Sequence, residues 1–131
     1  MISVVVLTKN EAANLPRCLD SVSFCDDVLV LDSGSTDETC PVAQARGARV
    51  MTRPFDSFGR QRNYAMDAGA LRHEWVLHLD ADEVVTPELR VELQRIATEG
   101  DALPAFRIPS RMACIRSLPL AVVRGRPSRR P

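Results

Sequence analysis

The chain of 131 residues is long enough for one domain with its own hydrophobic core. Its content of 45% hydrophobic and 26% charged residues is typical of globular proteins, and it contains no apolar run of the roughly 18 residues that a membrane span requires. Charge is unevenly distributed, because all 17 acidic residues lie at or before Asp101 whereas seven of the 17 basic residues follow it. An acidic domain is a poor nucleic-acid binder, so we expect no nucleic-acid partner.

The first residues and the cysteines both indicate a cytoplasmic protein. The run from Ile2 to Leu7 has no basic segment and no cleavage site, so it predicts a strand and not a signal peptide. The cysteines show neither metal-ligand spacing nor a dense disulfide pattern, which is typical of a reducing compartment. They are Cys18, Cys25, Cys40 and Cys114.

Hydrophobic periodicity predicts alternating strands and helices. Short apolar runs rich in β-branched residues predict strands over residues 2–7, 28–31, 48–52, 75–79 and 106–108. Apolar residues at helical spacing predict helices over residues 12–22, 35–46, 60–70 and 87–98. The alternation predicts an α/β fold, a mostly parallel sheet with helices on both faces.

Three local signals fix the expected ends of the helices. Ser35, with Glu38 three residues later, has the spacing of a capping box that opens the second helix. Gly47 follows that helix as a C-terminal stop. Thr86-Pro87 places an N-capping hydroxyl before a proline at the first helical position of the last helix.

Polar residues follow three of the predicted strands at their carboxyl ends. Thr8 to Glu11 follow the first strand, Asp32 ends the second, and Asp80 ends the fourth. In parallel sheets, ligands bind outside the carboxyl ends of the strands, where the strand order reverses. The agreement of three strand ends predicts a binding site at this edge.

Asp80 and Asp82 are candidate ligands of a divalent cation. Alternation along an extended backbone puts both carboxylates on one side, with the small Ala81 facing away. The two like charges repel each other, and a cation relieves that repulsion. A set of hard oxygen ligands favours Mn²⁺ or Mg²⁺ over zinc. The alternative is a solvated acidic turn that caps the next helix.

The segments that carry these features resemble glycosyltransferase family 2, the inverting nucleotide-sugar transferases with the GT-A (Rossmann-like) fold. The matching segments are Val4 to Glu11, Val30 to Asp37, Gln61 to Asn63 and Leu79 to Glu83. They occur in the family's order and spacing over residues 2–108. Their Thr-Lys-Asn-Glu and Asp-Ser-Gly-Ser-Thr-Asp variants are most similar to the bacterial branch that adds sugars to the lipopolysaccharide core.

The resemblance implies a nucleotide-binding role for residues at the first two strand ends. Thr8, Asn10 and Glu11 would line the base and ribose, and Asp32 would lie beside the base. Many family members carry a second aspartate where this chain has Ser33. A serine can donate a hydrogen bond to a base but cannot fix it with a charge, so a UDP-sugar is the favoured donor without being secured.

The resemblance also implies roles around the diphosphate. Arg62 would contact the diphosphate, Asp80 the ribose or the metal, and Asp82 the metal ion, Mn²⁺ or Mg²⁺. Several neighbours have structural alternatives. Ser35 and Asp37 are better explained as helix caps than as ligands, and Glu83 either supports the metal or caps the next helix. His78 is expected to be packed within its strand.

The predicted function is transfer of a sugar, with inversion, from a nucleotide-diphospho-sugar to a saccharide or lipid-linked acceptor. Inverting transfer needs a general base, and in the family that base is a carboxylate downstream of the acidic motif. This chain has no acid after Asp101, so the catalytic residue is unknown. The alternative is a truncated remnant that binds nucleotide sugar without transfer. A metal-dependent phosphohydrolase is a weaker third candidate, because its nucleophilic Asp would stand where Thr8 to Asn10 are.

These features divide the chain into a donor-binding domain over residues 1–108 and an Arg- and Pro-rich tail over residues 109–131. The tail shows no clear helical or strand period, so we expect much of it to be irregular. Two hypotheses explain it. One is aberrant sequence appended to a truncated donor half. The other is a basic segment that makes peripheral contact with the inner face of the cytoplasmic membrane.

Overall fold

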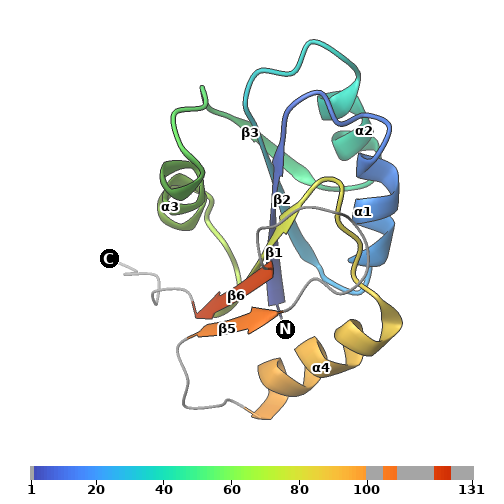
Figure 1. Ribbon diagram of the computed structural model, residues 1–131, viewed down its shortest axis with the longest axis vertical. Helices are drawn as coiled ribbons and strands as arrows, with labels where there is room; N and C mark the ends of the chain where they lie inside the picture. Colours follow the sequence, from blue (N-terminus) through green and yellow to red (C-terminus); the bar gives the residue numbers. More distant parts are fainter. Residues whose placement is uncertain (1, 100–104, 109–119, 125–131) are drawn as a thin grey trace.

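The computed structural model describes residues 2–99, 105–108 and 120–124 (Figure 1). Its strands are β1 (Ile2–Thr8), β2 (Asp27–Asp32), β3 (Arg49–Thr52), β4 (Trp75–Asp80), β5 (Ala105–Ile108) and β6 (Leu120–Arg124). Its helices are α1 (Leu15–Ser21), α2 (Thr39–Ala45), α3 (Phe58–Ala68) and α4 (Pro87–Glu99). The predicted alternation of strands and helices, including the strand near residues 106–108, is confirmed.

The strands form one six-stranded sheet in the order β3-β2-β1-β4-β6-β5. β1 pairs in parallel with β2 and with β4, and β2 pairs in parallel with β3. β6 lies antiparallel to both β4 and β5. The chain leaves β1 toward β2 on one side and returns to β4 on the other. The reversal of strand order therefore lies at β1 and β4, where a ligand is expected.

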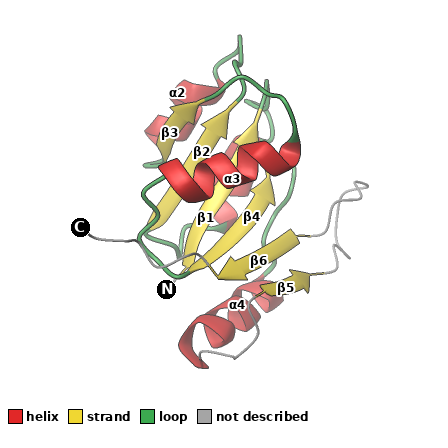
Figure 2. Ribbon diagram, turned by 90° about the vertical axis from the view of Figure 1, so that its left-hand side faces the viewer, coloured by secondary structure: helices red, strands yellow, loops and turns green. Residues whose placement is uncertain are grey.

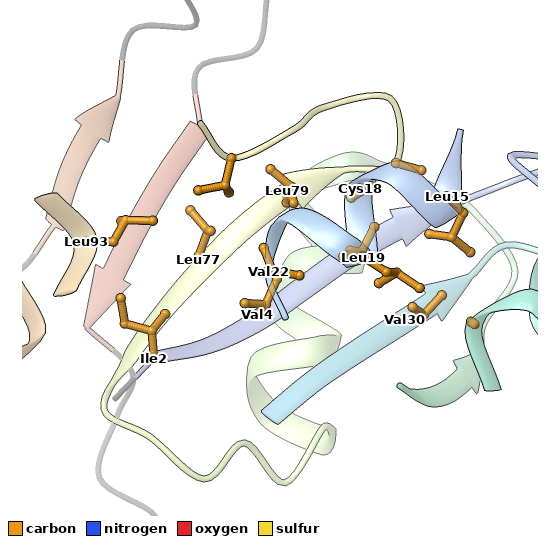
Figure 3. Packing of buried hydrophobic residues seen from close by; sticks show 14 of the residues in the cluster. Ile2, Val4, Leu15, Cys18, Leu19, Val22, Val30, Leu77, Leu79 and Leu93 are labelled. Atoms are coloured by element: carbon orange, nitrogen blue, oxygen red, sulfur yellow. The ribbon is translucent and has the colours of Figure 1, made fainter. Parts of the chain in front are cut away.

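Helices cover both faces of the parallel part of the sheet (Figures 1 and 2). The larger apolar cluster combines one face of β1 and β4 with α1, α2 and α4, and Figure 3 shows side chains such as Val4, Leu19 and Leu77 meeting within it. The smaller cluster lies under α3 and contains Val5 and Ala65. Because successive strand residues point to opposite faces, both sides of each central strand are apolar. The predicted α/β architecture is confirmed.

The ends of the helices agree with the sequence only in part. Thr86 caps α4, since its Oγ1 accepts a hydrogen bond from the Leu89 amide at 3.2 Å, and Gly47 has the left-handed φ of +81° expected after α2. The first helix is shorter than predicted and begins at Leu15.

The predicted capping box at Ser35 is wrong. α2 begins at Thr39, and the Ser35 hydroxyl instead accepts from the Asn10 amide at 2.7 Å and donates to Asp32. Asp37 does act near this helix end, because its carboxylate accepts from the Thr39 amide at 3.0 Å. The capping prediction failed because the partners of Ser35 belong to another loop and to its own strand end.

The prediction of irregular structure in the tail is wrong for Leu120–Arg124. This segment forms β6 and pairs with β4 through Trp75 to His78. Its run of apolar residues covers the edge of β4, whose backbone groups would otherwise need solvent. The density of Arg and Pro around the run hides it from a reading of periodicity. The other tail residues, 109–119 and 125–131, lie outside the described residues.

Two further findings concern the described part of the chain. None of its helices has the length and apolar character needed to cross a membrane. Cys18, Cys25 and Cys40 are free thiols.

Candidate functional site

The parallel pairing brings the three polar strand ends side by side. Thr8 is in register with Asp32, and Leu7 is in register with Asp80. Figure 1 shows the ends of β1, β2 and β4 at the same edge of the sheet. The sequence prediction that these strand ends meet is therefore confirmed.

A cavity of about 520 Å³ opens at this edge, and we call it the strand-tip cavity. The strand ends and the turn after β4 contribute Leu7, Thr8, Ser33, Asp80, Ala81 and Asp82 to its lining. The loop after β1 and the segment at the start of α3 contribute Lys9, Glu11, Phe55, Phe58 and Gln61. The cavity thus combines carboxylates, hydroxyls and an aromatic surface.

Three carboxylates gather beside the cavity, just after β4. One oxygen from each of Asp80, Asp82 and Glu83 lies within 4.8 Å of the others. The turn holds this trio together, because the Asp80 amide donates to Glu83 Oε1 at 3.0 Å and the Glu83 amide donates to the Asp80 carbonyl at 2.9 Å. Three hard oxygen ligands at this spacing fit Mg²⁺ or Mn²⁺.

The trio is electrostatically poised for a cation. Burial, together with repulsion from Asp80 and Asp82, raises the pKa of Glu83 to about 7. Burial and the negative charge of Asp82 likewise raise the pKa of Asp80, although the positive charge of Arg62 opposes them. Cys18 donates to the Asp80 carbonyl, and burial and the three carboxylates raise its pKa to about 12. A divalent cation would relieve this concentration of negative charge.

Arg62 and His78 lie close to the trio on the α3 side of the sheet. Burial and the charge of Arg62 lower the pKa of His78 to about 4, so its imidazole is neutral at pH 7. Within the described residues, Arg62 Nε and His78 Nδ1 are buried atoms that have no hydrogen-bond partner. One donor of the guanidinium is therefore buried without an acceptor beside the acidic cluster. The expectation that His78 is packed within β4 is confirmed, since it is 6% exposed.

Asp32 and Asn10 lie beside the cavity in a network that joins two loops. The Asp32 carboxylate accepts hydrogen bonds from Thr8 Oγ1 at 2.7 Å and from the Gly34 and Ser35 amides at 2.9 and 2.7 Å. Burial alone would raise the pKa of Asp32, but these hydrogen bonds outweigh it and hold the pKa below its usual value.

Asn10 completes the same network from the other loop. It adopts a left-handed φ of 52°, and its side-chain oxygen accepts from the Thr36 amide at 2.8 Å. Asn is one of the few residues other than glycine that enters this conformation readily. The network ties the loop after β1 to the loop after β2.

Gln61 connects α3 to the cavity wall. It is 1% exposed, and its Nε2 donates to Ser33 Oγ at 3.1 Å and to the Arg53 carbonyl at 3.3 Å. Its Oε1 accepts from Arg53 at 2.7 Å. Gln61 therefore fixes both the hydroxyl of Ser33 and the loop that leads into α3.

The structure brings most of the predicted site residues together. Thr8, Glu11, Ser33, Asp80 and Asp82 line the strand-tip cavity. Asn10 and Asp32 belong to the loop network beside it, and Arg62 lies next to Asp80 without lining the cavity.

Sequence reasoning missed the parts of the wall that α3 and the loop before it contribute. Gln61 falls within one of the matching segments, whereas no motif or spacing gives Phe55 and Phe58 a role. Two aromatic residues in a polar loop between a strand and a helix were the available signal. The sequence leaves Glu83 either as a group that supports the metal or as a helix cap, and the structure places its carboxylate within the trio.

The fold and the site define a class, namely α/β proteins that bind their ligand at the carboxyl edge of a parallel sheet beside a carboxylate cluster. The sequence profile of glycosyl transferase family 2 matches residues 3–122, and the chain belongs to this family. The match extends beyond residue 108 and includes the first residues of β6.

Similar proteins that are described as glycosyltransferases agree with this assignment. An uncharacterized glycosyltransferase of Rickettsia bellii is 38% identical over 96 residues, which are 72% of this chain and 32% of that protein. LpsC of Rhizobium meliloti, a lipopolysaccharide core biosynthesis glycosyltransferase, is 28% identical over 84% of this chain and 42% of its own length.

A solved structure shows the same fold. Glucosyl-3-phosphoglycerate synthase from Mycobacterium tuberculosis in complex with UDP is 30% identical and has a TM-score of 0.64 over 80% of this chain and 42% of its own. The fold is therefore the GT-A fold of this family. The chain spans about a third of the length of the Rickettsia bellii relative.

Proposed function

We propose that this chain forms the donor-binding half of a glycosyltransferase that moves a sugar from a nucleotide-diphospho-sugar to a saccharide or lipid-linked acceptor with inversion. The observation that carries the proposal is the trio of Asp80, Asp82 and Glu83 beside the strand-tip cavity. Carboxylates so close together repel one another, a divalent cation relieves that repulsion, and a diphosphate is the donor group that such a cation binds.

Different residues of the chain would bind different parts of the donor. Thr8, Glu11 and Ser33 would line the base and ribose, and Arg62 would meet a diphosphate oxygen. Asp80 and Asp82, with Glu83, would hold Mn²⁺ or Mg²⁺. A bound divalent cation supplies charge stabilisation to the departing nucleoside diphosphate. The network of Asn10 and Asp32 would keep the two base-side loops in place.

The relatives support the choice of donor and acceptor class. Glucosyl-3-phosphoglycerate synthase has been solved with Mn²⁺, UDP and glucosyl-3-phosphoglycerate, which supports a UDP-sugar and a divalent cation here. LpsC acts in lipopolysaccharide core biosynthesis, which supports an acceptor of the cell envelope. We propose a cytoplasmic location, with peripheral contact at the inner face of the membrane, where a lipid-linked acceptor would lie.

A second candidate is a module that binds nucleotide sugar without transferring it. The chain spans about a third of the length of its Rickettsia bellii relative, which fits this candidate as well as the first. The donor site would be the same in both cases, so binding alone does not separate the two functions.

Turnover separates them. The chain is incubated with Mn²⁺ and UDP-, GDP- or ADP-sugars, with and without saccharide acceptors, and NMR follows the anomeric carbon. A product of inverted configuration supports the transferase. Binding of a nucleotide sugar without product supports the second candidate. Failure to bind any of these donors contradicts both.

A further inference from the structure

We propose that Phe55 and Phe58 form an aromatic wall of the strand-tip cavity that stacks against the nucleobase of the donor. This inference rests on the proposed function and names how the base is held. The segment at the end of β1 consists of Thr8, Lys9 and Asn10 and contains no aromatic residue. The aromatic surface comes instead from the segment before and at the start of α3.

The two rings are paired and accessible. Their centroids lie 5.1 Å apart at an interplanar angle of 71°, an edge-to-face arrangement. Each phenylalanine is 49% exposed, and both line the cavity. Large exposed hydrophobic side chains are few in the described part of the chain, where Val91 is the other one. An aromatic surface of this kind within an acidic cavity calls for an apolar partner.

The loop that carries the rings is held in place before any ligand binds. Arg53 donates to both oxygens of Asp56, at 3.0 and 3.2 Å, and the Ser57 amide donates to Asp56 at 2.7 Å. The Ser57 hydroxyl then accepts from the Arg60 amide at 3.2 Å and caps α3. These hydrogen bonds hold the pKa of Asp56 at about 2, so the loop stays paired at neutral pH. A preorganised surface loses little entropy when a ligand docks.

The polar residue on the same wall, Gln61, favours a nucleobase as the ligand of the two rings. Gln61 lies one turn after Phe58 and holds the hydroxyl of Ser33 at the cavity, so a hydrogen-bonding group accompanies the aromatic surface. A nucleobase is flat, aromatic and uncharged, and it carries hydrogen-bonding edges. It can stack on the rings and bond to Ser33 at once, while the carboxylate trio takes the cation and the diphosphate. The aromatic pair would thus offset the missing second aspartate at position 33.

The test compares a ligand that has a base with one that does not. Calorimetry measures the dissociation constants of UDP and of inorganic pyrophosphate, both with Mn²⁺, for the wild type and for Phe55→Leu, Phe58→Leu and the double variant. Stacking on an aromatic ring contributes about 1–3 kcal/mol per base, so the double variant should bind UDP about five- to a hundredfold more weakly. Pyrophosphate binding should change less than about twofold, because it has no base to stack.

Matched controls separate stacking from loop collapse. Val91→Ala shortens an apolar side chain on α4 that is 66% exposed and does not line the cavity, so it should leave both affinities unchanged. Phe58→Tyr keeps the ring and should keep UDP affinity. UDP affinity that is unchanged in the double variant would overturn the inference, as would equal weakening of UDP and pyrophosphate. A loss seen with UDP-glucose but not with UDP would also overturn it and assign the rings to the sugar. A wild type that binds pyrophosphate but no nucleotide, or neither, would contradict the proposed function itself.

Discussion

Asp32 stands at the end of β2 with hydrogen bonds converging on both oxygens of its carboxylate. The Thr8 and Ser35 hydroxyls donate to Oδ1, and the Gly34 and Ser35 amides donate to Oδ2. Gly34 can take part because it adopts a left-handed φ of +94°, which side chains rarely tolerate. Asp32 is therefore a loop-building residue in this structure, and Ser33 is the residue beside it that faces the cavity.

Asp32→Ala is expected to destabilise the protein by about 2–4 kcal/mol, because it leaves the buried Thr8 hydroxyl and the part-buried donors of Gly34 and Ser35 without their acceptor. Urea denaturation at pH 7 measures the change in the free energy of unfolding. Asp67→Ala, which removes an exposed carboxylate on α3, is the control and should change stability by less than about 0.5 kcal/mol. Equal stabilities of the two variants would show that the loop network does not depend on Asp32.

At the residue scale, the sequence predicted the acids and hydroxyls of the site better than its wall. Asp80 and Asp82 could be recognised because they follow directly on an apolar strand. The expected alternation of the two is wrong, since β4 ends at Asp80, Asp82 lies in the turn after it, and Ala81 lines the cavity. Gln61, Phe55 and Phe58 could not be recognised, since their approach to Ser33 depends on how α3 packs across the sheet. Such contacts join segments distant in sequence, and periodicity carries no information about them.

At the scale of helices and strands, features with nearby partners were predicted and features with distant partners were not. The stop at Gly47 and the cap at Thr86 were predicted because their partners lie within about four residues. Ser35 was misassigned because it binds Asn10 from 25 residues away. β6 was missed because its evidence is a partner strand, β4, and not a pattern of its own.

Gly69 lies in the turn between α3 and β4, and Gly59 lies within α3. Substitution of each by alanine tests how closely the chain packs at these two positions. A Cβ at Gly69 would lie 2.3 Å from the Ala65 carbonyl oxygen and 2.6 Å from Leu29 Cδ2, whereas a Cβ at Gly59 would meet nothing within 4 Å. Gly69→Ala should therefore destabilise by about 1–3 kcal/mol through overpacking. Gly59→Ala, within α3, should be neutral or stabilise by up to about 1 kcal/mol.

Thermal denaturation of the two glycine variants against the wild type checks this contrast. Both substitutions add one methyl group, so composition cannot explain a difference between them. A Gly69→Ala variant as stable as Gly59→Ala would contradict the close packing of α3 against β2.

At the scale of the molecule, Asp27 ties together the edge of the sheet opposite the site. It is buried and accepts from Ser3 Oγ on β1 at 2.6 Å, from Arg49 on β3 at 2.9 Å and from the Arg72 amide before β4 at 2.8 Å. Burial by itself would raise the pKa of Asp27, but these partners outweigh it and lower the pKa.

A carboxyl group whose pKa is lower in the folded state stabilises the protein above its ordinary pKa and loses that contribution as the pH falls through the folded value. Asp27→Asn should therefore cost about 2–3 kcal/mol at pH 7, and the gap to the wild type should narrow below about pH 4. Urea denaturation at pH 7, 5 and 3 measures the gap, with Asp67→Asn as the exposed control. A gap that stays constant over this range would contradict the charged role of Asp27.

The described strands form one sheet, with the carboxylate trio at the carboxyl end of β4, and β6 and β5 extend that sheet beyond β4. The fold class, the mostly parallel sheet and the meeting of the polar strand ends were predictable, because they follow from periodicity and from the general rule for parallel sheets. The acceptor and the catalytic base were not predictable, because the sequence offers no carboxylate downstream of Asp101 to assign to that role.

The central claim is that a carboxylate trio after β4 holds a cation that binds a nucleoside diphosphate. The most direct measurement is a thermal-shift titration of the wild type and of Asp82→Ala with UDP, with and without Mn²⁺, using Asp67→Ala as the control. A ligand that binds only the folded state adds about 2.7 kcal/mol of stability at a hundred times its dissociation constant. We predict a UDP shift that requires Mn²⁺, persists in Asp67→Ala and is lost in Asp82→Ala. A cooperative transition that UDP and Mn²⁺ do not move, or an equal shift in Asp82→Ala, would contradict the assignment.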